Sequence, residues 1–232
     1  MARKKNAKYR YDIVQNDKEF VVVNKPAGLL AVPIKDSRVT NLQDMMFERF
    51  GKGGKLPIKA AHRIDRYTSG LMVFSKSNHT HEALKDQFLK QEVTRQYLAV
   101  VRGHPSSPNQ ELVHHLKLIK DGFRNIVVSP SEEGALPAQL NYQIVEELSG
   151  AALLRIWLKT GLKNQIRVQL NEIGHPLVGD RHYNTQEKNA DIDRQALHAE
   201  RLVFEHPSHP KQVDVKAEIP RDFQKLLNKL RH

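Results

Sequence analysis

The 232-residue sequence predicts an α+β protein with a mixed, mostly antiparallel central sheet and flanking helices. Several β-rich stretches follow one another between Glu111 and Leu158, with few helical patterns among them, whereas a doubly wound parallel sheet alternates strands with helices. Segments with apolar residues at helical spacing are few and short. A hydrophobic content of 39% is enough to bury a core in a chain of this length.

The first half of the chain begins with a predicted hairpin. Its strands run from Tyr11 to Gln15 and from Phe20 to Asn24, on either side of the turn-prone pair Asn16-Asp17. Residues 25–28, Lys-Pro-Ala-Gly, break the second strand and lead into a third short strand at residues 29–32. A helix is then predicted from Thr40 to Gly51, capped by Thr40 or Asn41.

The next predicted elements are a strand at residues 71–74, a helix capped by Asn78, and a strand at residues 96–102. Ile166, Leu170 and Ile173 then form the apolar stripe of another helix. Arg167 lies about 100° from this stripe, so it is expected to leave the core side and point into a cleft.

The chain ends with two predicted strands and one helix. The strands are expected at residues 196–205 and 212–218, and Pro220 is expected in the first turn of the terminal helix. Residues 1–10 are rich in Lys and Arg and are predicted to form a flexible basic arm, and residues 11–232 a single domain.

Charge and composition narrow the function. Thirty-seven Lys and Arg against 26 Asp and Glu leave a formal charge of +11, which favours RNA or another polyanion as partner, although a basic surface without a ligand stays open. No apolar run is long enough to span a membrane and no signal peptide follows the basic start, so a cytoplasmic protein is expected. The absence of cysteine excludes disulfides, thiolate nucleophiles and Cys-based metal sites.

The segment from His62 to Gly70 is the strongest candidate site. It places Asp65 between Arg63 and Arg66, directly before an apolar strand. Taken alone, such a cluster is most often an exposed ion pair worth about 0–1 kcal/mol. The small residues Thr68, Ser69 and Gly70 instead predict a constrained loop at a strand edge, where functional groups are usually presented.

This segment, HRIDRYTSGLMVFSK, is similar to the HRLDRxTSGLLL signature of the RluA-type pseudouridine synthases, in the form without the N-terminal S4 RNA-binding domain. VVVNKPAGLLAVP, TRQYLAVVRG, NQIRVQLNEIGHPLVGDRHY and ALHAERLVFEHP resemble further segments of that family, in the same order, over most of residues 12–207. The resemblance implies the pseudouridine synthase fold, with two lobes around a basic cleft, and isomerisation of specific uridines in structured ribosomal or transfer RNA.

The resemblance also implies roles for particular residues. Asp65 corresponds to the catalytic aspartate, Arg167 to its basic partner, and Tyr97 to the tyrosine that stacks on the target base. Arg63 corresponds to the residue that fills the gap left by a flipped nucleotide. The remaining residues expected to bind substrate are Lys25, His62, Arg66, Thr68, Asn164 and Gln165. We expect no cofactor, no metal site among the 12 histidines, no obligate protein partner and a monomer.

Two departures from the family pattern leave alternatives open. Leu162 and Asn164 stand where the family usually has Arg and His. They motivate a second reading, a noncatalytic RNA-binding or RNA-folding protein on the same scaffold. A third reading is a hydrolytic glycosylase that cleaves the same bond without rejoining it.

Overall fold

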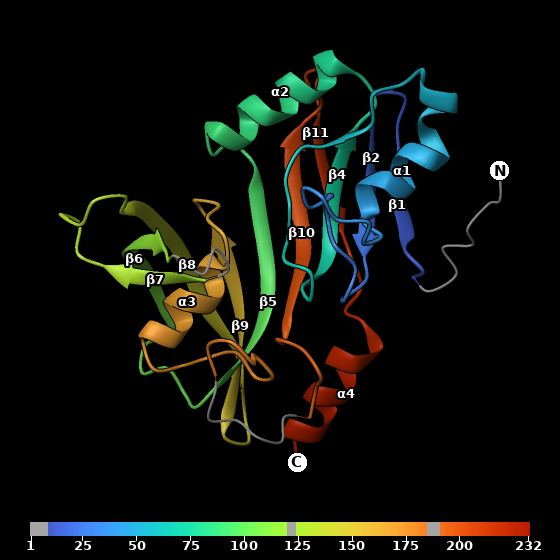
Figure 1. The fold of residues 1–232 in the computed structure, drawn as a ribbon. Helices are drawn as coiled ribbons and strands as arrows, with labels where there is room; N and C mark the ends of the chain where they lie inside the picture. Colours follow the sequence, from blue (N-terminus) through green and yellow to red (C-terminus); the bar gives the residue numbers. More distant parts are fainter. Residues whose placement is uncertain (1–8, 120–123, 185–190) are drawn as a thin grey trace. The chain divides into compact units, whose positions relative to one another are not determined.

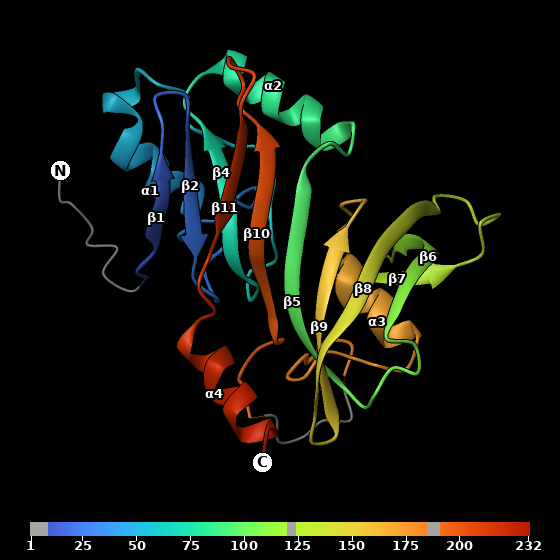
Figure 2. The same ribbon diagram turned by 180° about the vertical axis from the view of Figure 1, so that it is seen from behind.

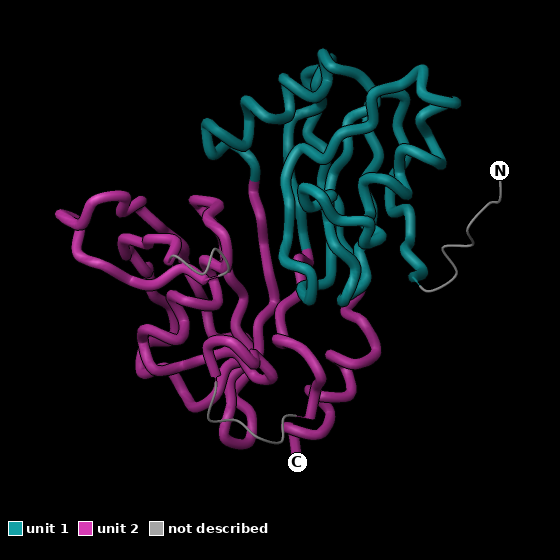
Figure 3. Tube along the Cα trace, in the orientation of Figure 1, with its two compact units in different colours: residues 1–93, 201–217 teal, residues 94–200, 218–232 magenta. Residues whose placement is uncertain are grey.

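The computed structural model describes residues 9–119, 124–184 and 191–232. The chain forms two compact units, coloured separately in Figure 3. Unit 1 contains residues 1–93 and 201–217, and unit 2 contains residues 94–200 and 218–232. The predicted basic arm lies outside the described residues except for Tyr9 and Arg10, and the predicted single domain stays a prediction.

Unit 1 is built on a sheet in the order β1-β2-β4-β10, with β11 paired to β10 and the short β3 paired to β4 (Figures 1 and 2). β1 (Asp12–Asn16) and β2 (Phe20–Lys25) form the predicted antiparallel hairpin. β3 (Lys59–Ala60) and β4 (Ser69–Ser75) follow, and β10 (Leu197–Glu205), which belongs to this unit from Arg201 onward, and β11 (Gln212–Lys216) complete the unit. β4 and β10 run in the same direction, so the sheet is mixed, as predicted (Figure 2).

The helices of unit 1 are α1 (Leu42–Phe50), which is followed by a single 3-10 turn (Lys52–Gly54), and α2 (Asn78–Leu89). The Asn41 side chain caps α1 by accepting a hydrogen bond from the Asp44 N–H, one of the two predicted caps. α2 is capped by Ser77, not by Asn78 as predicted. Leu84 of α2 packs on the sheet with Phe20 and Phe204, which closes the core of this unit.

Unit 2 has a sheet in the order β5-β9-β8-β6-β7. Its strands are β5 (Thr94–Arg102), β6 (Asn109–Leu118), β7 (Asn125–Val128), β8 (Leu136–Leu148) and β9 (Ala151–Leu158), and the neighbouring strands of this order are paired antiparallel. The helix α3 (Gln165–Glu172) packs on one face through Val168, against Leu116 and Ala138. The helix α4 (Arg221–Leu230) packs against Leu98 and Leu153 on the other face.

Besides the cap of α2, three sequence predictions were wrong in detail. Residues 29–32 do not form a strand, because the carbonyl oxygens of Leu30 and Ala31 accept hydrogen bonds from the N–H groups of Leu42 and Gln43 at the start of α1. Pro220 is the N-cap of α4 and not part of its first turn. Arg167 is buried, with 6% of its surface exposed, although its helical position predicted that it would leave the core side.

Within the described residues, no helix is both long enough and apolar enough to cross a membrane.

Candidate active site

In unit 1, Asp65 lies in the loop that joins β3 to β4. Ile64 is buried and anchors the loop, and the Thr68 N–H donates to the Asp65 carbonyl oxygen at 3.1 Å, which closes a turn. Thr68 and Ser69 are buried behind this turn, whereas Arg63 is exposed and Asp65 is half-buried. The turn therefore fixes the backbone of Asp65 while its carboxylate keeps partial access to solvent.

Lys25 binds the backbone of this loop. Its ammonium is completely buried and donates to the carbonyl oxygens of Pro26 and Leu29, both at 2.9 Å, and of Arg66, at 3.0 Å. An ammonium group has three N–H donors, and these three carbonyl oxygens are enough to occupy them. Lys25 thus connects the residues after β2 to the loop that carries Asp65.

Gly28 adds a second connection between the same two loops. Its N–H donates to the Arg66 carbonyl oxygen at 2.8 Å, and the Arg66 Nε donates to the Gly28 carbonyl oxygen at 2.9 Å. Gly28 has a backbone φ of +86°, which residues other than glycine rarely adopt. The predicted substrate residue Arg66 is therefore engaged through both its backbone and its side chain.

The imidazole of His62 packs inside unit 1. Its ring stacks on Phe88 with centroids 4.7 Å apart, and its Nε2 accepts a hydrogen bond from the Val73 N–H at 3.3 Å. His62 thus ties the start of the loop to β4 and α2. Arg63 differs from it: among the described residues, no hydrogen bond or ion pair involves its exposed side chain.

In unit 2, Tyr97 lies in the middle of β5 and is 6% exposed. It is paired with Ile156 of β9, which is paired in turn with Tyr142 of β8. Neighbouring paired residues share a face of a sheet. Tyr97 therefore points to the face on which α3 packs, and not to the face that α4 covers.

Arg167 of α3 is held in a buried network. Its Nε donates to Asp180 Oδ2 at 2.7 Å and its Nη2 to Asp180 Oδ1 at 2.8 Å, a bidentate pair in which the Asp180 side chain is fully buried. Its Nη1 donates to Asn164 Oδ1 at 3.0 Å, and the guanidinium lies over the ring of Tyr183 at 5.1 Å. A buried guanidinium is tolerated only when its charge is paired in this way. The pairing explains why Arg167 is buried although its position on the helix predicts exposure.

Asp180 and Tyr183 complete this network, and the sequence analysis did not single them out. Besides Arg167, the Asp180 carboxylate accepts the N–H groups of His182 and Tyr183, at 3.0 and 3.2 Å. Burial raises the pKa of the Tyr183 phenol, which exchanges hydrogen bonds with the backbone of Asn125. Both residues lie in the segment HPLVGDRHY, whose family resemblance was the only available signal.

The residues before α3 explain how the two departures fit this chain. Asn164 adopts the left-handed conformation, with φ of 55°, which asparagine tolerates better than most residues. Its Oδ1 binds Arg167, so it belongs to the network. Leu162 packs with Tyr183 and Val127 against the small core beneath α3. Both departures thus have a defined place in unit 2.

Gln165, predicted to bind substrate, has a buried and fully engaged amide. Its Oε1 accepts from the Thr160 hydroxyl and from the Leu162 N–H, at 2.9 and 3.0 Å. Its Nε2 donates to the Gln139 carbonyl oxygen and to Gln169 Oε1, at 3.2 and 3.0 Å. A carboxamide has two acceptor sites and two donors, and all four are used, so Gln165 fixes the start of α3.

Within the described ranges, no three His, Asp or Glu side chains are grouped so that they could hold a metal ion. The chemistry that these residues offer is that of carboxylate, guanidinium and phenol groups.

Comparisons with known proteins agree with the fold. Residues 19–172 match the family described as RNA pseudouridylate synthase. The chain belongs to this family, and the class of enzyme is therefore an RNA uridine isomerase.

Two relatives span most of the chain. The dual-specificity RNA pseudouridine synthase RluA of Escherichia coli K12 is 37% identical over 213 residues, 91% of this chain and 93% of the relative. The ribosomal large subunit pseudouridine synthase D of Zymomonas mobilis is 35% identical over 231 residues, 94% of this chain and 72% of the relative. Among solved structures, human RNA pseudouridylate synthase domain containing 4 has the same fold, with a TM-score of 0.77 at 23% identity over 94% of this chain and 92% of that one.

Proposed function

We propose that this enzyme isomerises specific uridines in structured ribosomal or transfer RNA. The observation that carries the proposal is the loop of Asp65, which places a half-buried carboxylate on a backbone fixed by Lys25 and Gly28. The formal charge of +11 suits a polyanionic substrate. One relative is named for dual specificity and another for the large ribosomal subunit, which supports RNA of these two classes as substrate.

In the proposed reaction, Asp65 stabilises or attacks the ribose C1′ of the target uridine while the C1′–N1 bond breaks. The uracil rotates and a C1′–C5 bond forms, which releases the Asp65 carboxylate from C1′ where the two have bonded. C5 then loses its proton to solvent and N1 gains one. Dividing one difficult substitution into two easier steps is what a carboxylate offers in glycosyl chemistry. The reaction is redox-neutral and consumes no second substrate.

We further propose that Arg167 is the basic partner of Asp65 and that Tyr97 stacks on the uracil. The Asp180 pair and the Asn164 contact would then orient Arg167, and Asn164 would act on substrate only through it. Arg63 would enter the RNA stack in place of the flipped uridine, which costs a few kcal/mol to extrude. Lys25, His62, Thr68 and Gln165 position the loop and the helix that carry these groups.

Release of tritium from RNA labelled at uridine C5 tests the reaction, because the label leaves only when C5 is rejoined. We expect release with the wild type and none with Asp65→Asn, whose RNA affinity should stay within about threefold because a carboxylate adds nothing to phosphate binding. The matched control is Asp12→Asn, since Asp12 is an exposed carboxylate of β1.

Each other reading has its own outcome. RNA binding without tritium release from any cellular RNA would favour the noncatalytic protein, and free uracil would favour the glycosylase. Turnover by Asp65→Asn would remove Asp65 from its role. Mapping of pseudouridine across cellular RNA with and without the protein then identifies the target.

A further inference from the structure

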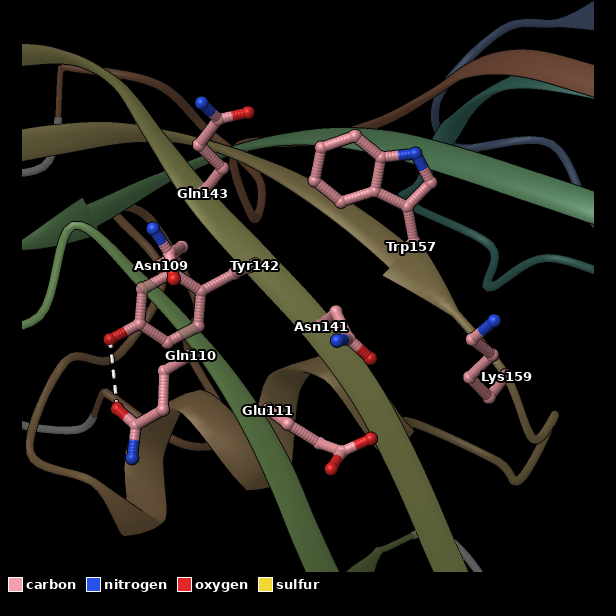
Figure 4. Close-up of a pocket in the computed structure, with 8 residues that line it drawn as sticks. All are labelled: Asn109, Gln110, Glu111, Asn141, Tyr142, Gln143, Trp157 and Lys159. Atoms are coloured by element: carbon pink, nitrogen blue, oxygen red, sulfur yellow. Dashed lines mark hydrogen bonds between the residues drawn. The ribbon is translucent and has the colours of Figure 1, made fainter.

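Unit 2 has an open pocket that is lined mainly from the sheet face opposite Tyr97. The pocket has a volume of about 510 Å³ (Figure 4). Six of its lining side chains lie on the face opposite Tyr97: Asn109, Glu111, Asn141, Gln143, Trp157 and Lys159. None of them has a part in the proposed catalysis.

The strand register places these side chains on one face. Asn141 of β8 lies opposite Glu111 of β6 on one side and Trp157 of β9 on the other, and Gln143 lies opposite Asn109. Lys159 follows Trp157 by two residues, so it continues the same face. α4 packs on this face at its other end, at Leu153, while Gln143 and Lys159 are exposed.

The chemistry of the pocket suits a neutral, flat, hydrogen-bonding group. The indole of Trp157 is half-buried and offers an aromatic surface, and Asn109, Asn141 and Gln143 offer carboxamides. Asn141 Oδ1 is buried without a hydrogen-bond partner among the described residues, and a buried acceptor of this kind calls for a donor. The carboxylate of Glu111 makes the centre of the pocket unfavourable for a phosphate.

Lys159 supplies the one cation among these six side chains. Its ammonium has no ion-pair partner among the described residues, and the side chain follows that of Trp157 by two residues on the same face of the sheet. An aromatic platform next to a cation is the arrangement with which proteins bind single-stranded nucleic acid, base on ring and phosphate on ammonium. Carboxamides add donor and acceptor pairs for a base edge.

We propose that this pocket binds an unpaired nucleobase in a single-stranded segment of the RNA, away from the uridine that is modified. The base stacks on Trp157, its edge donates to Asn141 Oδ1, and its phosphate lies near Lys159. The inference rests on the proposed RNA substrate and extends it: the enzyme reads a flanking strand with the sheet face opposite its catalytic tyrosine.

Trp157 is the only tryptophan in the chain, so its fluorescence reports directly on this pocket. The probe is a short oligoadenylate, which contains no uridine and cannot be turned over. We expect saturable quenching of the Trp157 emission by the single strand and little quenching by the same strand in a duplex, whose bases are already stacked. Equal quenching by the duplex, or none by either, would overturn the proposal.

Variants test the energetics with an end-labelled oligoadenylate followed by anisotropy. Trp157→Ala should weaken binding by about 5- to 100-fold, and Trp157→Phe by less, since base stacking survives on any aromatic ring. Lys159→Gln should weaken binding less than Trp157→Ala and flatten its salt dependence. The matched control is Val113→Ala, an exposed apolar residue of β6 outside the pocket, which should bind as the wild type does.

Failure of this inference is separable from failure of the proposed function. If Trp157→Ala binds oligoadenylate as well as Val113→Ala does, the nucleobase pocket is refuted, even if tritium release is normal. If a peptide and not RNA quenches Trp157, the pocket belongs to a protein partner and the proposal is equally refuted. If quenching occurs but no RNA releases tritium, the pocket stands and the isomerase assignment of the site fails.

Discussion

Asp180 is the residue on which the geometry of Arg167 depends most. It accepts two of the guanidinium N–H groups at 2.7 and 2.8 Å and is fully buried while doing so. Breaking a buried pair from one side leaves an uncompensated charge and costs roughly 3–5 kcal/mol. The network therefore stabilises unit 2 and also orients Arg167.

We expect Asp180→Asn to lower the free energy of unfolding in urea by roughly 3–5 kcal/mol, because the Arg167 guanidinium then faces an amide with one acceptor atom instead of two. The control is Asp193→Asn. Asp193 pairs with Arg181 at 3.6 Å on the open surface, so this change should leave the urea midpoint where it is. Equal midpoints for both variants would contradict a structural role for the buried pair.

In unit 1, the corresponding prediction concerns Lys25, which supports the loop of Asp65. Lys25→Met keeps the length and burial of the side chain but removes the donors to the carbonyl oxygens of Leu29 and Arg66. We expect tritium release to fall by at least tenfold with RNA affinity nearly unchanged, together with faster hydrogen exchange at the Gly28 N–H. Lys18→Met, at an exposed lysine, should change neither quantity. Loss of RNA affinity alone would mean that Lys25 acts on substrate.

At the scale of elements, most strands and helices could be predicted, because each is defined by local periodicity. Residues 29–32 could not, since the carbonyl oxygens of Leu30 and Ala31 bind the start of α1, 12 residues later in the chain. The burial of Arg167 was also hidden, because Asp180 lies beyond the end of α3 and no spacing rule connects the two. The sequence located Asp65 correctly in a loop before a strand, but not the support from Lys25, which is 41 residues before its partner Arg66 in the same loop.

The start of α3 depends on a single left-handed residue, Asn164. Asn164→Ala and Asn164→Gly both remove the acceptor of the Arg167 Nη1, so they differ chiefly in backbone strain. We expect the glycine variant to be more stable than the alanine variant by about 1 kcal/mol in urea, since φ of 55° disfavours a Cβ. The opposite order would show that α3 starts differently in solution.

The docking of α4 should depend on pH through Asp222. Burial alone would raise the pKa of this carboxyl, but hydrogen bonds and charge from Arg194 outweigh it and lower the pKa. A carboxyl with a lowered folded-state pKa contributes stability above its unfolded pKa of about 3.9, and this stability is lost as pH falls through the folded value.

Unfolding in urea between pH 7 and pH 3 checks this expectation. Asp222→Asn should be less stable than the wild type at pH 7, and the difference should shrink below about pH 4 as the wild-type carboxyl becomes protonated. Glu133→Gln, at an exposed carboxylate, should follow the wild type throughout. A constant difference from pH 7 to pH 3 would show that the charge of Asp222 is not what holds α4.

At the scale of the whole molecule, the excess of positive charge should dominate the affinity for RNA. A formal charge of +11 means that binding releases counterions from the phosphates, so the logarithm of the association constant falls linearly with the logarithm of salt concentration. Each phosphate contact contributes roughly 0.7 to 0.9 to the slope. Charged residues that bind phosphate and residues that bind bases therefore differ in a measurable way.

Arg63 distinguishes the two kinds of contact, because it is exposed and has no hydrogen-bond or ion-pair partner among the described residues. The affinity for a stem-loop RNA is measured in the Asp65→Asn variant and in the double variant Asp65→Asn, Arg63→Ala, so that neither measurement is disturbed by turnover. If Arg63 enters the RNA stack, Arg63→Ala in an otherwise wild-type chain should slow tritium release from a stem-loop. The dependence of RNA affinity on salt concentration should then stay the same. If it only contacts phosphate, the slope should fall by roughly 0.7 to 0.9 and an unstructured oligonucleotide should be affected equally. The latter result would refute the proposed part of Arg63 in flipping the uridine.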